Sequence, residues 1–248
     1  MGERGRRRRR PRQDADRILR LAAAGIGSGR PPVPAVVARA GDGGSRLAPH
    51  AESCSLKILY IYCHPVPESF HGALRVEALA GLAKAGHTVD LLDLYAEGFD
   101  PVLSTEGRRH YEDTSRNQDG LEPYVRRLRE ADALVVQFPT WCFGTPAMLK
   151  GFFDRMFMPG VAFDLSDPAH VRPMLANVKK IAGIVTYGRP RYMALYMADP
   201  PRKTVTRYMR WFTHGAKAEY HALYHLNVAS DAKRAGFMAR VRHAMERF

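Results

Sequence analysis

The segment Leu56-Lys-Ile-Leu-Tyr-Ile-Tyr-Cys63 is a short apolar run rich in residues that favour β-strands. It ends at His64-Pro65, and the residue before a proline is pushed away from the helical region. An apolar run of this length beside a chain-breaking proline predicts a strand that is buried on both faces, as in a parallel sheet. A regular pattern of elements therefore starts at Leu56.

A helix is predicted directly after this strand, over residues 69–85. Ser69 is a natural N-cap because its side-chain oxygen can accept a hydrogen bond from a free amide of the first turn. Gly86 is a natural stop, since glycine readily takes the left-handed conformation that ends helices. The apolar residues that recur with helical spacing are Leu74, Val76, Leu79 and Leu82.

The rest of the chain repeats the alternation of strand and helix. Residues 96–119 are polar and irregular and are expected to form a long excursion between elements. Five strands alternating with helices predict an α/β fold with a doubly wound parallel sheet. The other expected strands are 88–95, 133–138, 180–186 and 219–227, and the other expected helices are 122–131, 146–157, 204–212 and 231–248.

The first 55 residues differ in composition from everything that follows. They hold 12 Arg, no Lys and five acidic residues, and so carry +7 of the net charge of +13. A segment rich in Arg, Gly, Ala and Pro cannot bury enough apolar surface to offset its ordering entropy. We expect residues 1–55 to be a disordered basic extension and residues 56–248 to be the folded domain.

The role of this extension is open on sequence grounds. An Arg-rich run can bind nucleic acid or act as a nuclear signal, or can resemble an organelle transit peptide. The interpretation we favour is a solvated tail or a mis-called upstream start. The remainder is only mildly basic, so no nucleic-acid partner is expected for the core domain.

Cysteine content and hydropathy suggest a cytoplasmic protein. Three scattered cysteines provide no disulfide framework, which is typical of a reducing compartment. No stretch approaches ~18 consecutive apolar residues, so no membrane span is expected.

Three loops follow the first, third and fourth predicted strands, at residues 64–72, 139–146 and 186–191. Ligands of doubly wound sheets bind outside the carboxyl ends of the strands, so these loops should form the site. None carries a G-x-G-x-x-G or Walker pattern. Ser69 and His64, with amides at the start of the first helix, could hold a phosphate, although Ser69 could equally serve only as an N-cap.

The second loop carries aromatic residues where a ligand would lie. Trp141 and Phe143 flank Cys142, and Gly144 follows. Aromatic side chains beyond the end of a strand can stack on a flat heteroaromatic ligand, or can simply belong to the core.

Together these loops resemble the flavodoxin-like NAD(P)H dehydrogenase (quinone) family. The first matches the family's "H-P-x-x-x-S-F" at His64, Pro65, Ser69 and Phe70. The segment 89–101 is similar to its "D-L-Y … F-x-P". Residues 138–157 are close to its "F-P-x-x-W-F-G-x-P-A-x-L-K-G-x-x-D-R-x-F", with Trp141 one place earlier. The resemblance is good over residues 56–165 and weaker afterwards.

This resemblance implies a flavodoxin-like sheet of order 2-1-3-4-5 and a bound flavin, either FMN or FAD. It implies that hydride passes from the co-substrate NAD(P)H through the flavin to a quinone-type acceptor, in a homodimer. Tyr192 is the implied catalytic residue, although no His follows to complete the family's proton-relay pair. The implied flavin contacts are His64, Ser69, Phe70 and His71 on the phosphate and ribityl side, Pro139, Thr140, Trp141, Cys142, Phe143 and Gly144 along the ring, and Thr186, Tyr187 and Gly188 at its pyrimidine edge.

Several alternatives stay open. The same scaffold could serve an azo-, nitro- or flavin reductase, a flavodoxin-like electron carrier, or a regulatory flavin-binding subunit of a potassium-efflux system. NADH and NADPH are not distinguished, although Arg189 and Arg191 could favour a 2′-phosphate. His221 and His225 have the i,i+4 spacing of a zinc site only on a helix, and they lie in a predicted strand, so no metal is expected.

Overall fold

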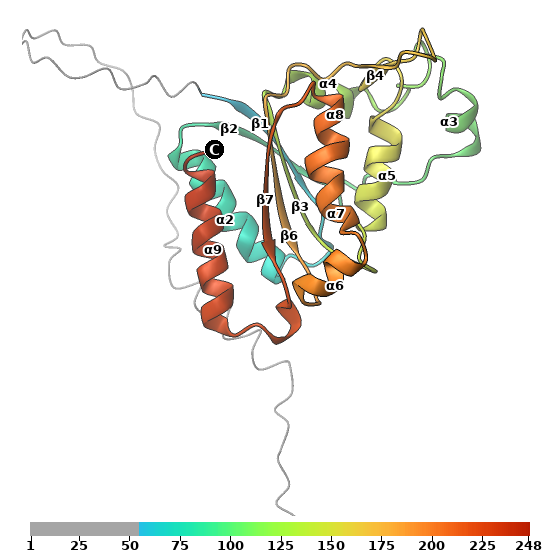
Figure 1. Cartoon of the computed structure of the whole chain (residues 1–248). Helices are drawn as coiled ribbons and strands as arrows, with labels where there is room; N and C mark the ends of the chain where they lie inside the picture. The colour runs from blue at the N-terminus through green and yellow to red at the C-terminus, as the bar shows by residue number, and fades with distance from the viewer. Residues whose placement is uncertain (1–54) are drawn as a thin grey trace, which may run out of the picture. The chain divides into compact units, whose positions relative to one another are not determined.

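The computed structural model describes residues 55–248, so the predicted basic extension lies outside the described residues except for Ser55. A parallel sheet of five strands forms the centre of this part (Figure 1). Its order is β2-β1-β3-β6-β7, which is the expected 2-1-3-4-5 order. The strands are β1 (Lys57–Tyr62), β2 (Thr88–Asp93), β3 (Ala133–Pro139), β6 (Lys180–Thr186) and β7 (Lys217–Leu223).

The register of the sheet brings the carboxyl ends of its strands to one edge. Gln137 of β3 pairs with Tyr62, the last residue of β1. Pro139, the last residue of β3, pairs with Thr186, the last residue of β6. The loops that leave these strands therefore start side by side.

Helices cover both faces of the sheet. The helices α2 (Phe70–Lys84) and α9 (Asp231–Met245) lie side by side on one face. Apolar residues from both helices join one buried cluster with residues of the strands. The elements of the other face include α4 (Glu122–Glu130), α5 (Ala147–Met156), the π-helix η1 (Thr204–Met209) and α8 (Arg210–Phe212).

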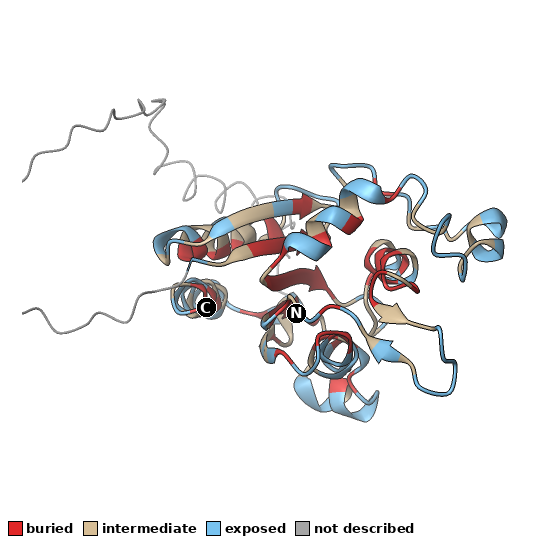
Figure 2. Cartoon of the chain, turned by 90° about the horizontal axis from the view of Figure 1, so that it is seen from above, coloured by how far each residue is buried: buried red, intermediate tan, exposed pale blue. Residues whose placement is uncertain are grey.

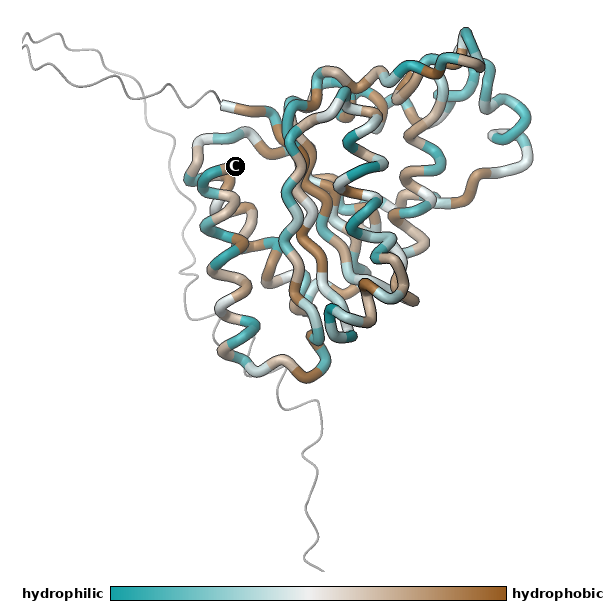
Figure 3. Tube along the Cα trace, viewed as in Figure 1, coloured by the Kyte–Doolittle hydropathy of each residue, from teal (hydrophilic) through white to brown (hydrophobic). Residues whose placement is uncertain are grey.

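The core lies between these two layers. All seven residues of β3 are buried, as expected for the central strand of a sheet covered on both faces. The edge strand β2 is mostly exposed or half-buried. The trace is apolar along the middle of the sheet (Figure 3), and buried residues gather there and on the inward sides of the helices (Figure 2). Removal of this apolar surface from water is the main force that holds the layers together.

The predicted limits of the first helix are confirmed. The Ser69 side chain accepts a hydrogen bond from the Gly72 amide at 3.2 Å. Gly86 follows the helix with a φ of +80°, a conformation that glycine adopts at little cost. Gly81 lies at the contact between α2 and α9, because a Cβ there would come 2.5 Å from the Arg242 carbonyl oxygen.

Other predicted boundaries are wrong. The fifth strand was expected at 219–227 but ends at Leu223, because His225 takes a left-handed φ of +61° and η2 (Leu226–Val228) follows. The closing helix ends at Met245 rather than at 248. The helix expected at 204–212 is a π-helix and a short α-helix, preceded by α7 (Pro200–Lys203).

Some short elements were not expected at all. The polar excursion contains α3 (Thr105–Arg109). A small antiparallel pair, β4 (Phe163–Asp164) and β5 (Arg172–Pro173), follows α5. The helix α6 (Arg191–Tyr196) follows β6.

Candidate functional site

The three loops that were expected to form the site begin from strand ends that are bonded to one another. The Cys63 amide donates to the Gln137 carbonyl oxygen at 3.0 Å, and the Thr140 amide donates to the Thr186 carbonyl oxygen at 2.8 Å. The Tyr187 amide in turn donates to the Leu223 carbonyl oxygen at 2.8 Å. The loops after β1, β3 and β6 are thus held at one edge of the sheet, where such folds bind ligands.

The loop after β3 opens with a tight turn in an unusual backbone conformation. Trp141 and Gly144 exchange two backbone hydrogen bonds, at 3.2 and 2.9 Å. The residues between them, Cys142 and Phe143, have φ values of +50° and +58°. Two consecutive left-handed residues are the mark of a type I′ turn, which normally carries Asn or Gly. Such strain costs on the order of 1 kcal/mol or more per residue and is concentrated at functional sites.

This turn exposes its aromatic and sulfur side chains. Trp141 is 43% exposed, Cys142 is exposed and Phe143 is half-buried. By contrast Cys63, at the end of β1, is buried, and burial raises the pKa of its thiol to about 12. Of these two cysteines only Cys142 can therefore meet a ligand.

The loop after β1 contributes His64, whose ring lies near both His71 of α2 and Trp141 of the turn. Its ring stacks on His71 with centroids 5.4 Å apart and lies 6.3 Å from the ring of Trp141. Nδ1 of His64 lies 3.1 Å from both the amide and the carbonyl oxygen of Val66. Burial lowers the pKa of His64, so the ring favours its neutral form. His64 and Trp141 form an aromatic corner between two loops.

The same loop folds tightly over the start of α2. Gly72 allows this approach, because a Cβ there would lie 1.9 Å from the Pro67 carbonyl oxygen. Ser69 and Phe70 are half-buried. The structure places Ser69 as the N-cap of α2, at a helix end where amides and the helix dipole favour an anion. Its predicted contact with a phosphate stays a prediction.

His71 lies differently from the sequence-based expectation. Its side chain is buried, with Nε2 2.8 Å from the Thr186 hydroxyl and Nδ1 3.2 Å from the Gln137 amide nitrogen. Burial, followed by the neighbouring His64, lowers the pKa of His71 to about 3. Both ring nitrogens are engaged inside the protein, so the ring is not placed to contact a phosphate.

Gln137 and Tyr60 were not identified from the sequence. Both are fully buried, and the Tyr60 hydroxyl donates to Oε1 of Gln137. A signal was present, because Gln137 is the one polar residue in the apolar run from Ala133 to Phe138. A buried amide near the end of a strand requires hydrogen-bond partners.

The residues at the carboxyl end of β6, Thr186 and Tyr187, point into different layers of the fold. Thr186 faces α2 through His71, whereas the Tyr187 side chain lies in the opposite layer and bonds to Asp199 and Tyr220. The amide and carbonyl of Tyr187 are also bonded, to Leu223 and Leu226. Tyr187 therefore has a structural position and offers no free group to the predicted ring edge.

The other predicted residues are distributed around the edge. Pro139 is buried, and Thr140, Gly144 and Gly188 are half-buried. Gly188 packs against Asn227, since a Cβ would lie 3.2 Å from that side chain. Tyr192, the candidate catalytic residue, lies on α6 and is 71% exposed.

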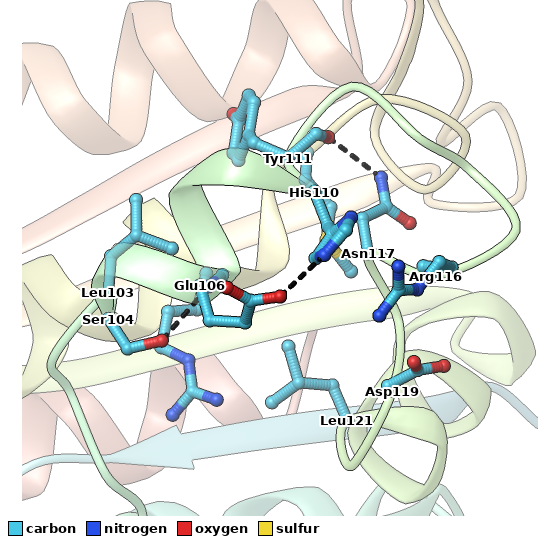
Figure 4. Close-up of a pocket in the computed structure, with 12 residues that line it drawn as sticks. Leu103, Ser104, Glu106, His110, Tyr111, Arg116, Asn117, Asp119 and Leu121 are labelled. Atoms are coloured by element: carbon cyan, nitrogen blue, oxygen red, sulfur yellow. Dashed lines mark hydrogen bonds and ion pairs between the residues drawn. The ribbon is translucent and has the colours of Figure 1, made fainter.

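Of two cavities in the described part of the chain, one includes a residue of these loops. One of about 240 Å³ is formed by the excursion between Leu103 and Leu121 and contains none of the predicted site residues (Figure 4). Another of about 420 Å³ begins at Thr145, next to the turn, and extends to the basic residues Lys150, Lys203 and Arg207. Lys150 is paired with Asp154.

Within residues 55–248 no group of three metal-ligating side chains is found. His221 lies in β7 beside Glu219, with 3.2 Å between Nε2 and Oε2. None of the described helices combines the length and the hydropathy needed to span a membrane.

The residues at the edge fit a flat heteroaromatic cofactor by their chemistry. The His64 and Trp141 rings provide surfaces for stacking, and the start of α2 provides amides for a phosphate. The buried Thr186 hydroxyl is hydrogen-bonded to Nε2 of His71, its one partner in the described part of the chain. A hydroxyl can make more than one hydrogen bond, so this group has capacity left for a ligand.

A family model with the description "flavodoxin-like fold" matches residues 56–247. The ribosyldihydronicotinamide dehydrogenase [quinone] of Rattus norvegicus is 36% identical over 126 residues, which cover 44% of this chain and 54% of that protein. The NAD(P)H dehydrogenase [quinone] 1 of Cavia porcellus is 31% identical over 149 residues, which cover 53% and 54%. The chain thus spans about half the length of the curated relatives it matches.

One solved structure matches a larger share of this chain than these relatives do. The crystal structure of Smu.1420 from Streptococcus mutans superposes with a TM-score of 0.68 at 30% sequence identity. The match covers 77% of this chain and all of that one.

Proposed function

Since the chain belongs to the flavodoxin-like fold family, we propose that it is a flavin-dependent NAD(P)H oxidoreductase that reduces a quinone or a similar flat acceptor. The names of the quinone dehydrogenase relatives support this activity. The observation that carries the proposal is the convergence of the three loops at the carboxyl edge, with an aromatic corner, the start of a helix and a hydroxyl that has hydrogen-bonding capacity left.

Flavin, when bound, supplies the hydride-accepting and hydride-donating chemistry, and the protein supplies position and electrostatics. We assign the ring-lining role to the turn from Trp141 to Gly144 and to His64. The start of α2 holds the phosphate, and Thr186 donates a hydrogen bond to the ring. The neutral state of His64, whose pKa is lowered by burial, keeps a fixed positive charge away from the ring.

The finer assignments belong to the same proposal. The co-substrate NAD(P)H and the acceptor would reach the site in turn from the solvent side, where Trp141 is accessible. The hydroxyl of Tyr192, on a largely exposed side chain, is the candidate for exchanging a proton with the acceptor. A homodimer would complete the site from a second copy.

Removal of the two aromatic side chains of the turn tests the ring-lining role. We expect Trp141→Ala/Phe143→Ala to raise the dissociation constant for flavin about tenfold or more. Each aromatic stack contributes roughly 0.5–1.5 kcal/mol beyond its buried area, and ~1.4 kcal/mol is tenfold in affinity. Flavin binding is measured by quenching of flavin fluorescence, and turnover by NADPH oxidation with menadione.

A matched control is available at the opposite end of the sheet, where the strands begin. Trp211 is 46% exposed, close to the 43% of Trp141, and lies shortly before the amino end of β7. Trp211→Ala should leave flavin affinity and turnover unchanged. A double variant with wild-type flavin content and rate would show that the turn does not line the ring.

A further inference from the structure

A buried chain of polar side chains runs beneath the candidate site. It joins Tyr60 of β1, Gln137 of β3, His71 of α2 and Thr186 of β6. Each of these side chains is at most 2% exposed. Buried polar groups need hydrogen-bond partners, and the direction of each hydrogen bond here follows from its neighbours.

The orientation of the Gln137 amide is set by a backbone carbonyl. Nε2 of Gln137 lies 2.7 Å from the carbonyl oxygen of His71. A carbonyl oxygen can only accept, so the NH₂ group of the amide must face it. Oε1 then faces Tyr60, whose hydroxyl donates to it.

The tautomer of His71 follows from this amide. Nδ1 of His71 faces the same NH₂ group at 3.2 Å, and therefore accepts. Burial lowers the pKa of the ring to about 3, so the ring is neutral near pH 7 and carries a single hydrogen. That hydrogen lies on Nε2, which donates to the Thr186 hydroxyl at 2.8 Å.

The chain of donors ends at Thr186. Its oxygen accepts from His71, so its own hydrogen is turned elsewhere. Across residues 55–248 no acceptor for this hydrogen is found. Thr186 is the last residue of β6, at the edge where the loops converge. The hydroxyl hydrogen is thus available for an acceptor atom at the site.

We infer that Gln137 and His71 are positioning residues that fix the Thr186 hydroxyl as a hydrogen-bond donor to an acceptor atom, a ring nitrogen or carbonyl oxygen, of the bound heteroaromatic cofactor. This inference rests on the proposed function, and it assigns His71 a role beneath the cofactor instead of at its phosphate. A donor at this atom stabilises negative charge on the ring, so it favours the reduced form.

The direction of the hydrogen bonds that lead from Gln137 to Thr186 is tested without any cofactor. Full-length protein labelled with ¹⁵N-histidine is examined by two-bond ¹H–¹⁵N correlation, and His71 is identified by the signal that disappears in His71→Gln. The Nε2–H tautomer, unchanged between pH 6 and 8, is the expected result. An Nδ1–H tautomer, or a ring protonated at pH 6, would overturn the inference.

The consequence for the cofactor is tested by removing the hydroxyl. Thr186→Val should weaken flavin binding by fivefold or more and lower the midpoint potential of the bound flavin, whereas Thr186→Ser, which keeps the donor, should stay near wild type. The matched control is Thr213→Val, because Thr213 is also buried but bonds within its own helix end, to the carbonyl oxygens of Met209 and Arg210.

The positioning role of Gln137 is tested by combining its substitution with that of Thr186. Gln137→Met removes the group that orients His71 and should weaken flavin binding in the wild-type background. In the Thr186→Val background it should have no further effect, because the donor it orients is already absent. Fully additive losses would mean that Gln137 acts only on stability. Circular dichroism confirms that each variant is folded.

The two levels of the proposal fail in different ways. If the wild-type protein binds neither FMN nor FAD, the proposed function fails and the inference fails with it. If the wild type binds flavin and Thr186→Val binds it equally tightly, the inference alone is wrong and the proposed function stands.

Discussion

Thr186 and Tyr187 are neighbours in the chain but serve opposite layers of the molecule. Successive side chains of a strand point to opposite faces, so only Thr186 can turn toward α2. Tyr187 enters the other layer, where its ring stacks on Tyr224 at 4.4 Å. The loop motif alone predicted both residues as cofactor contacts, because a motif does not say which face each residue takes.

The strained residues Cys142 and Phe143 illustrate the same limit. Their left-handed backbone could not be read from residue types that normally avoid it. What could be predicted was the position of the aromatic residues beyond the end of a strand. The turn keeps this conformation because the two hydrogen bonds between Trp141 and Gly144 close it.

The buried neutral ring of His71 gives the stability of the protein a pH dependence. Its pKa is lowered to about 3 in the folded state, against roughly 6.5 when unfolded. The stability contributed by the neutral ring is therefore complete above pH ~6.5 and is lost as pH falls from there toward 3. The loss approaches about 1.4 kcal/mol per pH unit.

Urea unfolding at pH 7.5 and pH 5.0 measures this effect in the wild type and in His71→Gln. We expect the wild type to lose roughly 2 kcal/mol more than the variant over this interval, because the variant has no ring to protonate. Equal losses in the two proteins would contradict the buried, neutral state of His71.

At the scale of elements, the contact between α2 and α9 is set by one small residue. Gly81 faces the Arg242 carbonyl oxygen and the Met245 side chain, and an added Cβ would lie 2.5 and 2.8 Å from them. Gly236, within α9, has only the end of the Arg240 side chain nearby, at 3.7 Å. An added methyl group would therefore clash at Gly81 and fit at Gly236, within the same pair of helices.

The matched substitutions Gly81→Ala and Gly236→Ala should change stability in opposite directions. Gly81→Ala should lower the free energy of unfolding by roughly 1–3 kcal/mol, since it overpacks the contact. Gly236→Ala should raise it by up to about 1 kcal/mol, the gain in helix propensity. Chemical denaturation decides this, and a stabilising Gly81→Ala would show that the two helices do not pack so closely.

The main elements could be predicted because each carries a strong local pattern. The apolar run in β1 and the Ser69 cap of α2 both act through neighbours in sequence, and both are confirmed. The end of β7 was predicted too late, because the left-handed backbone at His225 has no signal in its side chain. The pair β4 and β5, two residues each, and the six-residue α6 are too short to show a periodic pattern.

At the scale of the whole molecule, strand order and register assemble the site. The order places β1, β3 and β6 next to one another, so the three loops meet although more than 100 residues separate the first from the last. This convergence was predictable from the fold class. The hydrogen-bonded chain through Gln137 was not, because its partners come from four different elements.

Binding of a redox-active flavin at this edge of the sheet is what the proposed function requires. It is tested most directly by the visible absorbance spectrum of the purified full-length protein, supplied with FMN or FAD and then treated anaerobically with NADPH and with menadione. We expect a flavin band that bleaches with NADPH and returns with menadione. A protein that takes up neither flavin, or whose bound flavin is unchanged by both NADPH and NADH, would contradict it.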